Sequence, residues 1–166
     1  MPKPTSTEQT ILVVDDEPAV LGVVTTMLTQ EGFRVLQANG SSDALRLCKN
    51  HQGRIDLLVT DLVLPPPGFS FASDANEFPH VHGHDLALRA LHMRKDLRIV
   101  LISGNMDKDL AGYGIRQGVL PFIEKPLQSP AFVNLVKQVL QRPPPTVESL
   151  TETRKDNPND DNEWVD

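Results

Sequence analysis

Short apolar segments alternate with longer amphipathic segments along the first 140 residues of the chain. Apolar runs of about four to six residues favour buried strands, and they occur at 11–14, 33–38, 56–60, 97–102 and 120–123. Apolar residues at helical spacing predict helices at 18–32, 41–50, 84–94, 108–117 and 130–140. We expect Asp16 or Glu17 to cap the first helix and Ser41 or Ser42 to cap the second.

This alternation of five strands with five helices predicts an α/β fold. Strands that are apolar on both sides are typical of a parallel sheet with helices on both faces. Right-handed crossovers make such a sheet doubly wound. Ligands of doubly wound sheets bind beyond the carboxyl ends of the strands, so we expect the functional chemistry there.

The chain divides into a short polar start, one domain and an acidic end. Residues 1–9 contain two prolines and are expected to be flexible. The domain occupies 10–141, and Pro143-Pro144-Pro145 marks its end. After these prolines the chain has seven acidic residues and only two basic residues, Arg154 and Lys155. We therefore expect 142–166 to be a disordered acidic tail.

Composition excludes several classes of protein. The formal charge of −6 argues against a nucleic-acid partner, because phosphate backbones bind basic surfaces. No apolar stretch is long enough to span a membrane or to form the core of a signal peptide. Cys48 is the single cysteine, so no disulfide can form within the chain, and its apolar neighbours predict a buried thiol. A cytoplasmic location is expected.

Residues with useful chemistry follow four of the predicted strands. They are Asp15 and Asp16 after the first strand, Asp61 after the third, Ser103 after the fourth and Lys125 after the fifth. In a parallel sheet these positions converge on one edge. Each residue has an ordinary explanation when taken alone, such as helix capping, turn formation or a solvated lysine. Their joint occurrence at the strand ends favours a functional site instead.

The chemistry of this set is consistent with phosphoryl transfer. Three clustered carboxylates repel one another, and a hard divalent cation such as Mg²⁺ or Mn²⁺ relieves that repulsion. Asp61 can attack phosphorus as a nucleophile and form an acyl phosphate. Lys125 and the Ser103 hydroxyl can stabilise charge on the transferring oxygens.

Four sequence segments give the chain a close resemblance to the response-regulator receiver domain of two-component signalling, of the chemotaxis-regulator type. The segments are Ile-Leu-Val-Val-Asp15-Asp16-Glu-Pro, Asp56-Leu-Leu-Val-Thr-Asp61-Leu-Val-Leu-Pro65, Leu-Ile-Ser103-Gly104 and Phe122-Ile-Glu-Lys125-Pro126. The resemblance covers about residues 10–141. It implies a flavodoxin-like sheet with strand order 2-1-3-4-5.

The resemblance also implies roles for individual residues. Asp61 would be the phosphoacceptor, phosphorylated by a histidine kinase or a histidine phosphotransfer protein. Asp15, Asp16 and Asp61 would hold magnesium, with the Val63 carbonyl as a further ligand. Ser103 and Lys125 would contact the phosphoryl group, and Phe122 would change rotamer when Ser103 moves. The Lys125-Pro126 bond would be cis.

The chain departs from the family after the third strand. Gly83 follows Pro65 after 17 intervening residues, where receivers usually have a much shorter link. The loop at 66–82 is therefore an insertion, and its phenylalanines would either anchor a partner or pack locally. His80, His82 and His84 would suit a transition metal, but a polar loop entering a helix is the simpler interpretation.

Three functions remain open from the sequence. The leading one is a phosphoacceptor that is not an enzyme in the ordinary sense and whose phosphorylated state is read by an unidentified protein. The second is an adaptor with a receiver fold that no longer switches. The third is a metal-dependent phosphohydrolase. Gly112 and Gly114 weaken the predicted helix at 108–117 and favour a mobile, switching segment.

Overall fold

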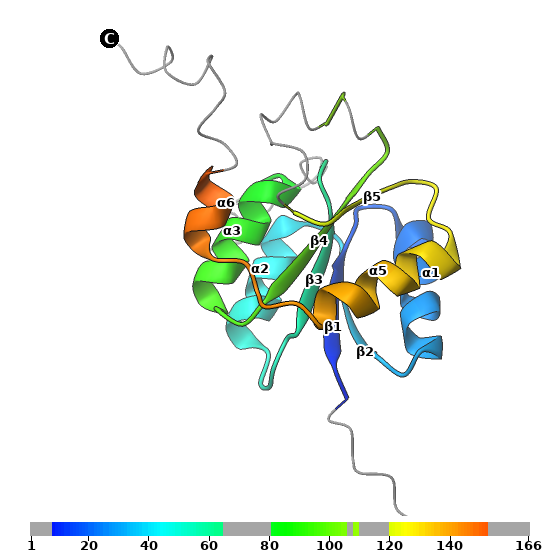
Figure 1. Cartoon of the computed structure of the whole chain (residues 1–166), viewed down its shortest axis with the longest axis horizontal. Coiled ribbons are helices and arrows are strands. Elements are labelled where there is room, and N and C mark those ends of the chain that lie inside the picture. Colours follow the sequence, from blue (N-terminus) through cyan, green and yellow to red (C-terminus); the bar gives the residue numbers. More distant parts are fainter. Residues whose placement is uncertain (1–7, 65–80, 106–107, 110–119, 153–166) are drawn as a thin grey trace, which may run out of the picture.

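The computed structural model describes residues 8–64, 81–105, 108–109 and 120–152 (Figure 1). The first half of the domain contains β1 (Thr10–Val14), α1 (Pro18–Gln30), β2 (Arg34–Ala38), α2 (Ser41–Asn50) and β3 (Leu57–Asp61). The second half contains α3 (Gly83–Met93), β4 (Arg98–Ser103), β5 (Phe122–Glu124), α5 (Ser129–Leu140) and α6 (Val147–Glu152).

The five strands form one parallel sheet in the order β2-β1-β3-β4-β5. In Figure 1 α1 and α5 lie on one side of the sheet, and α2 and α3 lie on the other. The order reverses its direction at β1, so the crossovers that build the two halves wind over opposite faces. The predicted doubly wound fold, including its strand order, is confirmed.

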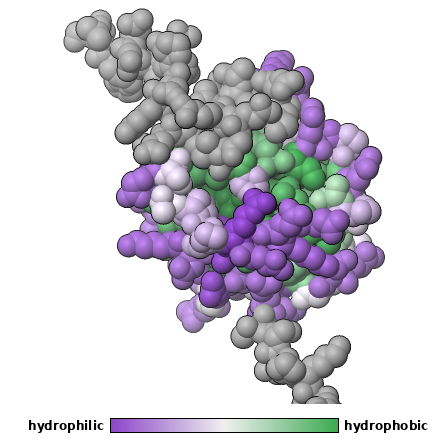
Figure 2. Space-filling view, in the orientation of Figure 1, coloured by the Kyte–Doolittle hydropathy of each residue, from purple (hydrophilic) through white to green (hydrophobic). Residues whose placement is uncertain are grey.

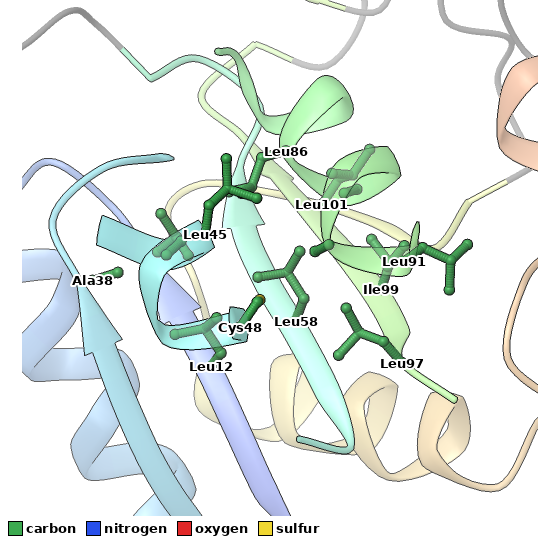
Figure 3. Close-up of a cluster of buried hydrophobic side chains, with 14 of the residues drawn as sticks. Leu12, Ala38, Leu45, Cys48, Leu58, Leu86, Leu91, Leu97, Ile99 and Leu101 are labelled. Atoms are coloured by element: carbon green, nitrogen blue, oxygen red, sulfur yellow. The ribbon is translucent and has the colours of Figure 1, made fainter. Parts of the chain in front are cut away.

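The core consists of two apolar layers separated by the sheet. Side chains alternate along each strand, so Leu12 and Leu58 pack toward α2 and α3, whereas Ile11 and Val59 pack toward α1 and α5. Figure 3 shows the first of these layers, with Cys48 of α2 among the leucines. β1 and β3 are buried along their whole length, which explains why the sequence shows them as continuous apolar runs.

Polar residues dominate the outer surface of the face shown in Figure 2, with apolar residues between them. Within the described residues no helix is both long enough and apolar enough to cross a membrane. Cys48 is buried as predicted, and burial raises the pKa of its thiol to about 11, against a smaller effect of Arg94. This thiol therefore stays protonated near neutral pH.

Two details of the predicted elements are wrong. Gly40, not a serine, is the N-cap of α2, and no side chain caps this helix. The hydroxyl oxygen of Ser41 accepts a hydrogen bond from Val81 N–H at 2.9 Å. The fifth strand begins at Phe122 rather than Leu120. Pro121 has no N–H to donate, so only its carbonyl joins the ladder, accepting from Leu101 N–H at 3.0 Å.

The expectation of a disordered tail from residue 142 is also wrong for part of that segment. Residues Val147–Glu152 form α6, which lies beside α3 (Figure 1). Leu150 is fully buried in the layer that contains α3, and Val147 packs against it. Two apolar side chains one turn apart thus attach this acidic segment to the domain, although its composition alone predicts disorder.

Several predictions fall outside the described residues. They concern residues 1–7, residues 66–80 of the predicted insertion, the predicted switching helix around Gly112 and Gly114, and the tail from 153 onward.

Candidate functional site

The carboxyl ends of the strands bring the predicted residues together. β1 is followed directly by Asp15, and β3 ends at Asp61. β4 ends at Ser103, and Lys125 follows β5. Asp15, Asp61 and Ser103 are almost completely buried, whereas Asp16 is exposed. The sheet therefore assembles at one edge residues that are far apart in the sequence.

Three carboxylates lie close enough to share one cation. Asp15, Asp16 and Asp61 each offer an oxygen atom, and these atoms lie within 4.8 Å of one another. Asp15 Oδ1 accepts a hydrogen bond from Glu17 N–H at 2.9 Å, and Asp61 Oδ1 accepts one from Val63 N–H at 3.0 Å. These backbone bonds fix the direction of the two buried carboxylates.

Lys125 closes the site from the β5 side. Its Nζ lies 2.6 Å from Asp61 Oδ2 and 3.1 Å from Asp15 Oδ2. Its backbone N–H donates to the Ser103 carbonyl at 2.7 Å, which ties Lys125 to the end of β4. The Lys125-Pro126 peptide bond is cis, as predicted. One ammonium group thus bridges two buried carboxylates.

Comparisons with known proteins agree with this fold. Residues 11–70 match the family model described as the response regulator receiver domain. The DNA-binding transcriptional regulator NtrC of Azospirillum brasilense is 31% identical over 131 residues, which are 79% of this chain and 24% of that protein. A response regulator receiver protein from Sinorhizobium medicae WSM419 has a solved structure that superposes with a TM-score of 0.63. It is 28% identical, and the match covers 81% of this chain and 95% of that one.

This chain contains a response-regulator receiver domain. Receiver domains are the phosphoacceptor modules of two-component signalling rather than enzymes of metabolism. Another relative, the two-component response regulator ARR2 of Arabidopsis thaliana, is 24% identical over 132 residues, or 80% of this chain and 18% of that protein. The chain therefore spans less than a quarter of the length of either curated relative. DNA binding in the name of the Azospirillum protein does not fit our expectation of no nucleic-acid partner, which stays a prediction.

The electrostatics of the receiver site follow from its burial and its excess of carboxylates. Burial raises the pKa of Asp61, although hydrogen bonds from Lys125 and from Val63 N–H act in the opposite direction. Burial also acts to lower the pKa of Lys125, but its hydrogen bonds to Asp61 and Asp15 outweigh this effect, and the pKa rises. Lys125 therefore remains a cation beside the two buried carboxylates.

The set of donor atoms fits a hard divalent cation. Asp15 Oδ2 is buried and, apart from the ion-pair contact with Lys125, has no hydrogen-bond partner within the described part of the chain. All three side chains that meet there offer oxygen, which suits magnesium or manganese better than softer metals that prefer nitrogen or sulfur ligands. Receiver domains bind magnesium at an acidic pocket of this kind.

Ser103 has a contact that the sequence analysis did not predict. Its hydroxyl donates a hydrogen bond to Asp109 Oδ2 and accepts one from Asn105 N–H at 3.1 Å. Phe122, predicted as a rotameric switch, is partly buried against the layer that contains α2 and α3. The sequence gives one signal for this contact: Asp109 is an acidic residue near the start of the predicted helix at 108–117.

Gly83 places the start of α3 directly on the site. A Cβ atom at this position would meet the Asp61 carbonyl oxygen at 2.2 Å and Leu62 Cα at 2.8 Å. The Gly83 N–H donates to the Leu62 carbonyl at 2.8 Å. The chain that leaves β3 thus returns to it after the insertion, and only glycine permits this close approach.

The predicted histidines near α3 do not gather as metal ligands in the described residues. His82 is the N-cap of α3: its Nδ1 accepts from Asp85 N–H at 3.4 Å, and its Nε2 lies 3.1 Å from Asp85 Oδ2. His84 is buried. In the described ranges these residues do not form a cluster of three metal ligands, whereas the aspartates do. His80 lies outside those ranges.

Proposed function

We propose that Asp61 accepts a phosphoryl group from a histidine kinase or a histidine phosphotransfer protein in a magnesium-dependent reaction. A protein partner then reads the phosphorylated state. The observation that supports this proposal is the position of Asp61, with one oxygen against the Lys125 ammonium at 2.6 Å and two further carboxylates beside it.

The reaction is a transfer of the phosphoryl group between two nucleophiles. An Asp61 oxygen forms the new bond to phosphorus, the bond from phosphorus to the donor histidine breaks, and the imidazole leaves with the electron pair. Lys125 is already held at Asp61, so its charge is in place when negative charge moves onto the phosphoryl oxygens. Burial of Asp61 limits the access of water that would compete with the carboxylate for the phosphoryl group.

The neighbouring residues would bind and position the group. Asp15 and Asp16, together with Asp61 and the Val63 carbonyl, would hold the cation. When bound, the cation supplies positive charge to the phosphoryl oxygens. Ser103 would donate its hydroxyl hydrogen to one of these oxygens, and Phe122 would repack as Ser103 changes position.

An apolar groove beside Lys125 suits the protein that donates the phosphoryl group. The groove has a volume of about 530 Å³, and its walls are residues of α1 and of the segment after β5: Ala19, Val20, Val23, Val24, Lys125, Pro126 and Leu127. Val23 is 52% exposed. Because Lys125 both lines this groove and contacts Asp61, we infer that an apolar helix face of the histidine donor binds here.

Phosphoryl uptake from a small donor tests the proposal. The full chain is incubated with acetyl phosphate, with magnesium or with excess chelator, and its intact mass is measured. We expect one phosphoryl group per chain with magnesium and none with chelator. No uptake in either condition would favour an adaptor that does not switch. Repeated hydrolysis of phosphate esters would favour a phosphohydrolase.

A further inference from the structure

The hydroxyl of Ser103 is fully engaged in the structure. Ser103 is completely buried, and its Oγ donates to Asp109 Oδ2 while it accepts from Asn105 N–H. A serine hydroxyl carries a single hydrogen. That hydrogen cannot be given to another acceptor unless the bond to Asp109 breaks.

The backbone of Ser103 is fixed next to Asp61. In the sheet register Asp61 pairs with Ile102, so Ser103 stands one residue beyond the phosphoacceptor's partner. On the other side, the Ser103 carbonyl accepts from Lys125 N–H. The main chain therefore cannot move far, and reorienting the side chain is the available way to redirect the hydroxyl.

Local turn formation does not require the Asp109 side chain. Asn105 already holds this turn, since its Oδ1 accepts from Lys108 N–H at 3.2 Å and its carbonyl accepts from Asp109 N–H at 2.9 Å. The Asp109 carboxylate is directed to Ser103 instead. This carboxylate is partly exposed, so water can solvate it when the hydroxyl leaves.

We propose that Asp109 is a positioning residue that holds the Ser103 hydroxyl in the unphosphorylated protein and competes with a phosphoryl group on Asp61 for its hydrogen. This inference rests on the proposed function. Both competitors are anionic acceptors, so the exchange replaces one charge-assisted hydrogen bond by another. Asp109 thereby lowers the affinity of the site for a phosphoryl group and sets the balance between the two states of Ser103.

The affinity of the site for a stable phosphoryl mimic tests this role. Beryllium fluoride is titrated into the full chain with saturating magnesium. Removing the acceptor in Asp109→Ala should tighten binding about tenfold, because the parent must give up one hydrogen bond to a charged group. Asp109→Asn keeps an acceptor without the charge and should tighten binding by less. The matched control is Lys108→Ala, which changes an exposed neighbour and should leave the affinity within about twofold.

A double-mutant cycle separates positioning from a general loosening of the segment. In a Ser103→Ala background the change at Asp109 should have no further effect, since the competing hydrogen is gone. Thermal melts show which variants fold, and Asp109→Asn carries the comparison if Asp109→Ala does not fold. Unchanged affinity in both Asp109 variants, or tighter binding that persists without the Ser103 hydroxyl, would overturn the inference.

Failure of this inference differs from failure of the proposed function. Phosphoryl uptake by the parent from acetyl phosphate is measured in parallel. Uptake together with unchanged affinity in the Asp109 variants removes only the role of Asp109. Absence of uptake by the parent removes the proposed function and the inference with it.

Discussion

A buried aspartate lies at each end of β3, but in the described residues only the Asp61 end gathers further carboxylates. Asp56 precedes the strand and is 7% exposed, and Asp61 ends it and is 6% exposed. Asp56 Oδ2 accepts from Thr10 N–H at 2.8 Å, and its Oδ1 lies 2.9 Å from Arg54 Nε. Each oxygen of Asp56 thus has its own donor. Within the described residues, Asp56 does not belong to a cluster of potential metal ligands.

Asp61 is equally buried but shares its cation. The Lys125 ammonium contacts both Asp61 and Asp15, and Asp16 adds a third carboxylate. The difference shows that burial of an acid does not by itself indicate function. An excess of carboxylates over cations favours binding of a metal ion at the Asp61 end, which the proposed phosphoryl transfer requires, whereas the Asp56 end is a closed structural contact.

Replacing each of the two aspartates separately by asparagine should give the largest difference between the two ends of β3. Asp61→Asn should abolish phosphoryl uptake and leave stability unchanged or slightly higher, because it removes a desolvated carboxylate. Asp56→Asn should retain uptake but lose about 1–3 kcal/mol of stability, since its hydrogen bonds are buried. Intact mass after acetyl phosphate treatment and urea unfolding measure the two effects. Uptake by Asp61→Asn that equals uptake by the parent would contradict the comparison.

Substituting alanine for a glycine near each end of β3 should distinguish a local clash from ordinary backbone strain. Gly83→Ala places a methyl group against the Asp61 carbonyl and should cost about 1–3 kcal/mol while slowing phosphoryl uptake. Gly53 lies at the Asp56 end with φ of +120°, and Gly53→Ala should cost a similar amount, about 1–2 kcal/mol. Its uptake rate should stay that of the parent. Equal loss of uptake in both variants would mean that global stability, not contact with Asp61, controls the site.

A charge in the apolar groove should affect only transfer from a protein donor. Val23→Asp places a carboxylate on the exposed wall of the groove and should slow transfer from a phosphorylated histidine kinase about tenfold, as loss of an interface anchor does. Uptake from acetyl phosphate serves as the control and should not change. Equal rates from the kinase in parent and variant would place the donor on another surface.

The smallest expected effect is a pH dependence of stability. The pKa of Asp61 is raised by burial, so the folded state holds this proton more tightly than the unfolded state does. The protonated Asp61 carboxyl contributes to stability below the pKa of the unfolded state, about 3.9, and this contribution is lost as pH rises through the higher folded pKa. In magnesium-free buffer Asp61→Asn should therefore gain stability relative to the parent between about pH 3.5 and 7. Unfolding curves across this range would contradict the account if the parent gained instead.

The sequence predicts the sheet and the position of the site because both depend on the ends of apolar runs. A parallel sheet brings Asp15, Asp61 and Lys125 to one edge whatever the intervening segments do. It does not predict α6, since Leu150 becomes buried only when α3 is present as a partner. The contact between Ser103 and Asp109 is equally hidden, because turn geometry after β4 decides which acceptor the hydroxyl meets.

Chemical mapping of the phosphorylated residue tests the central claim most directly. The chain is phosphorylated with acetyl phosphate and magnesium, the acyl phosphate is reduced with borohydride, and the peptides are sequenced by mass spectrometry. The account predicts that position 61 alone is converted to homoserine. Conversion at Asp15, Asp16 or Asp56 with position 61 intact would contradict it.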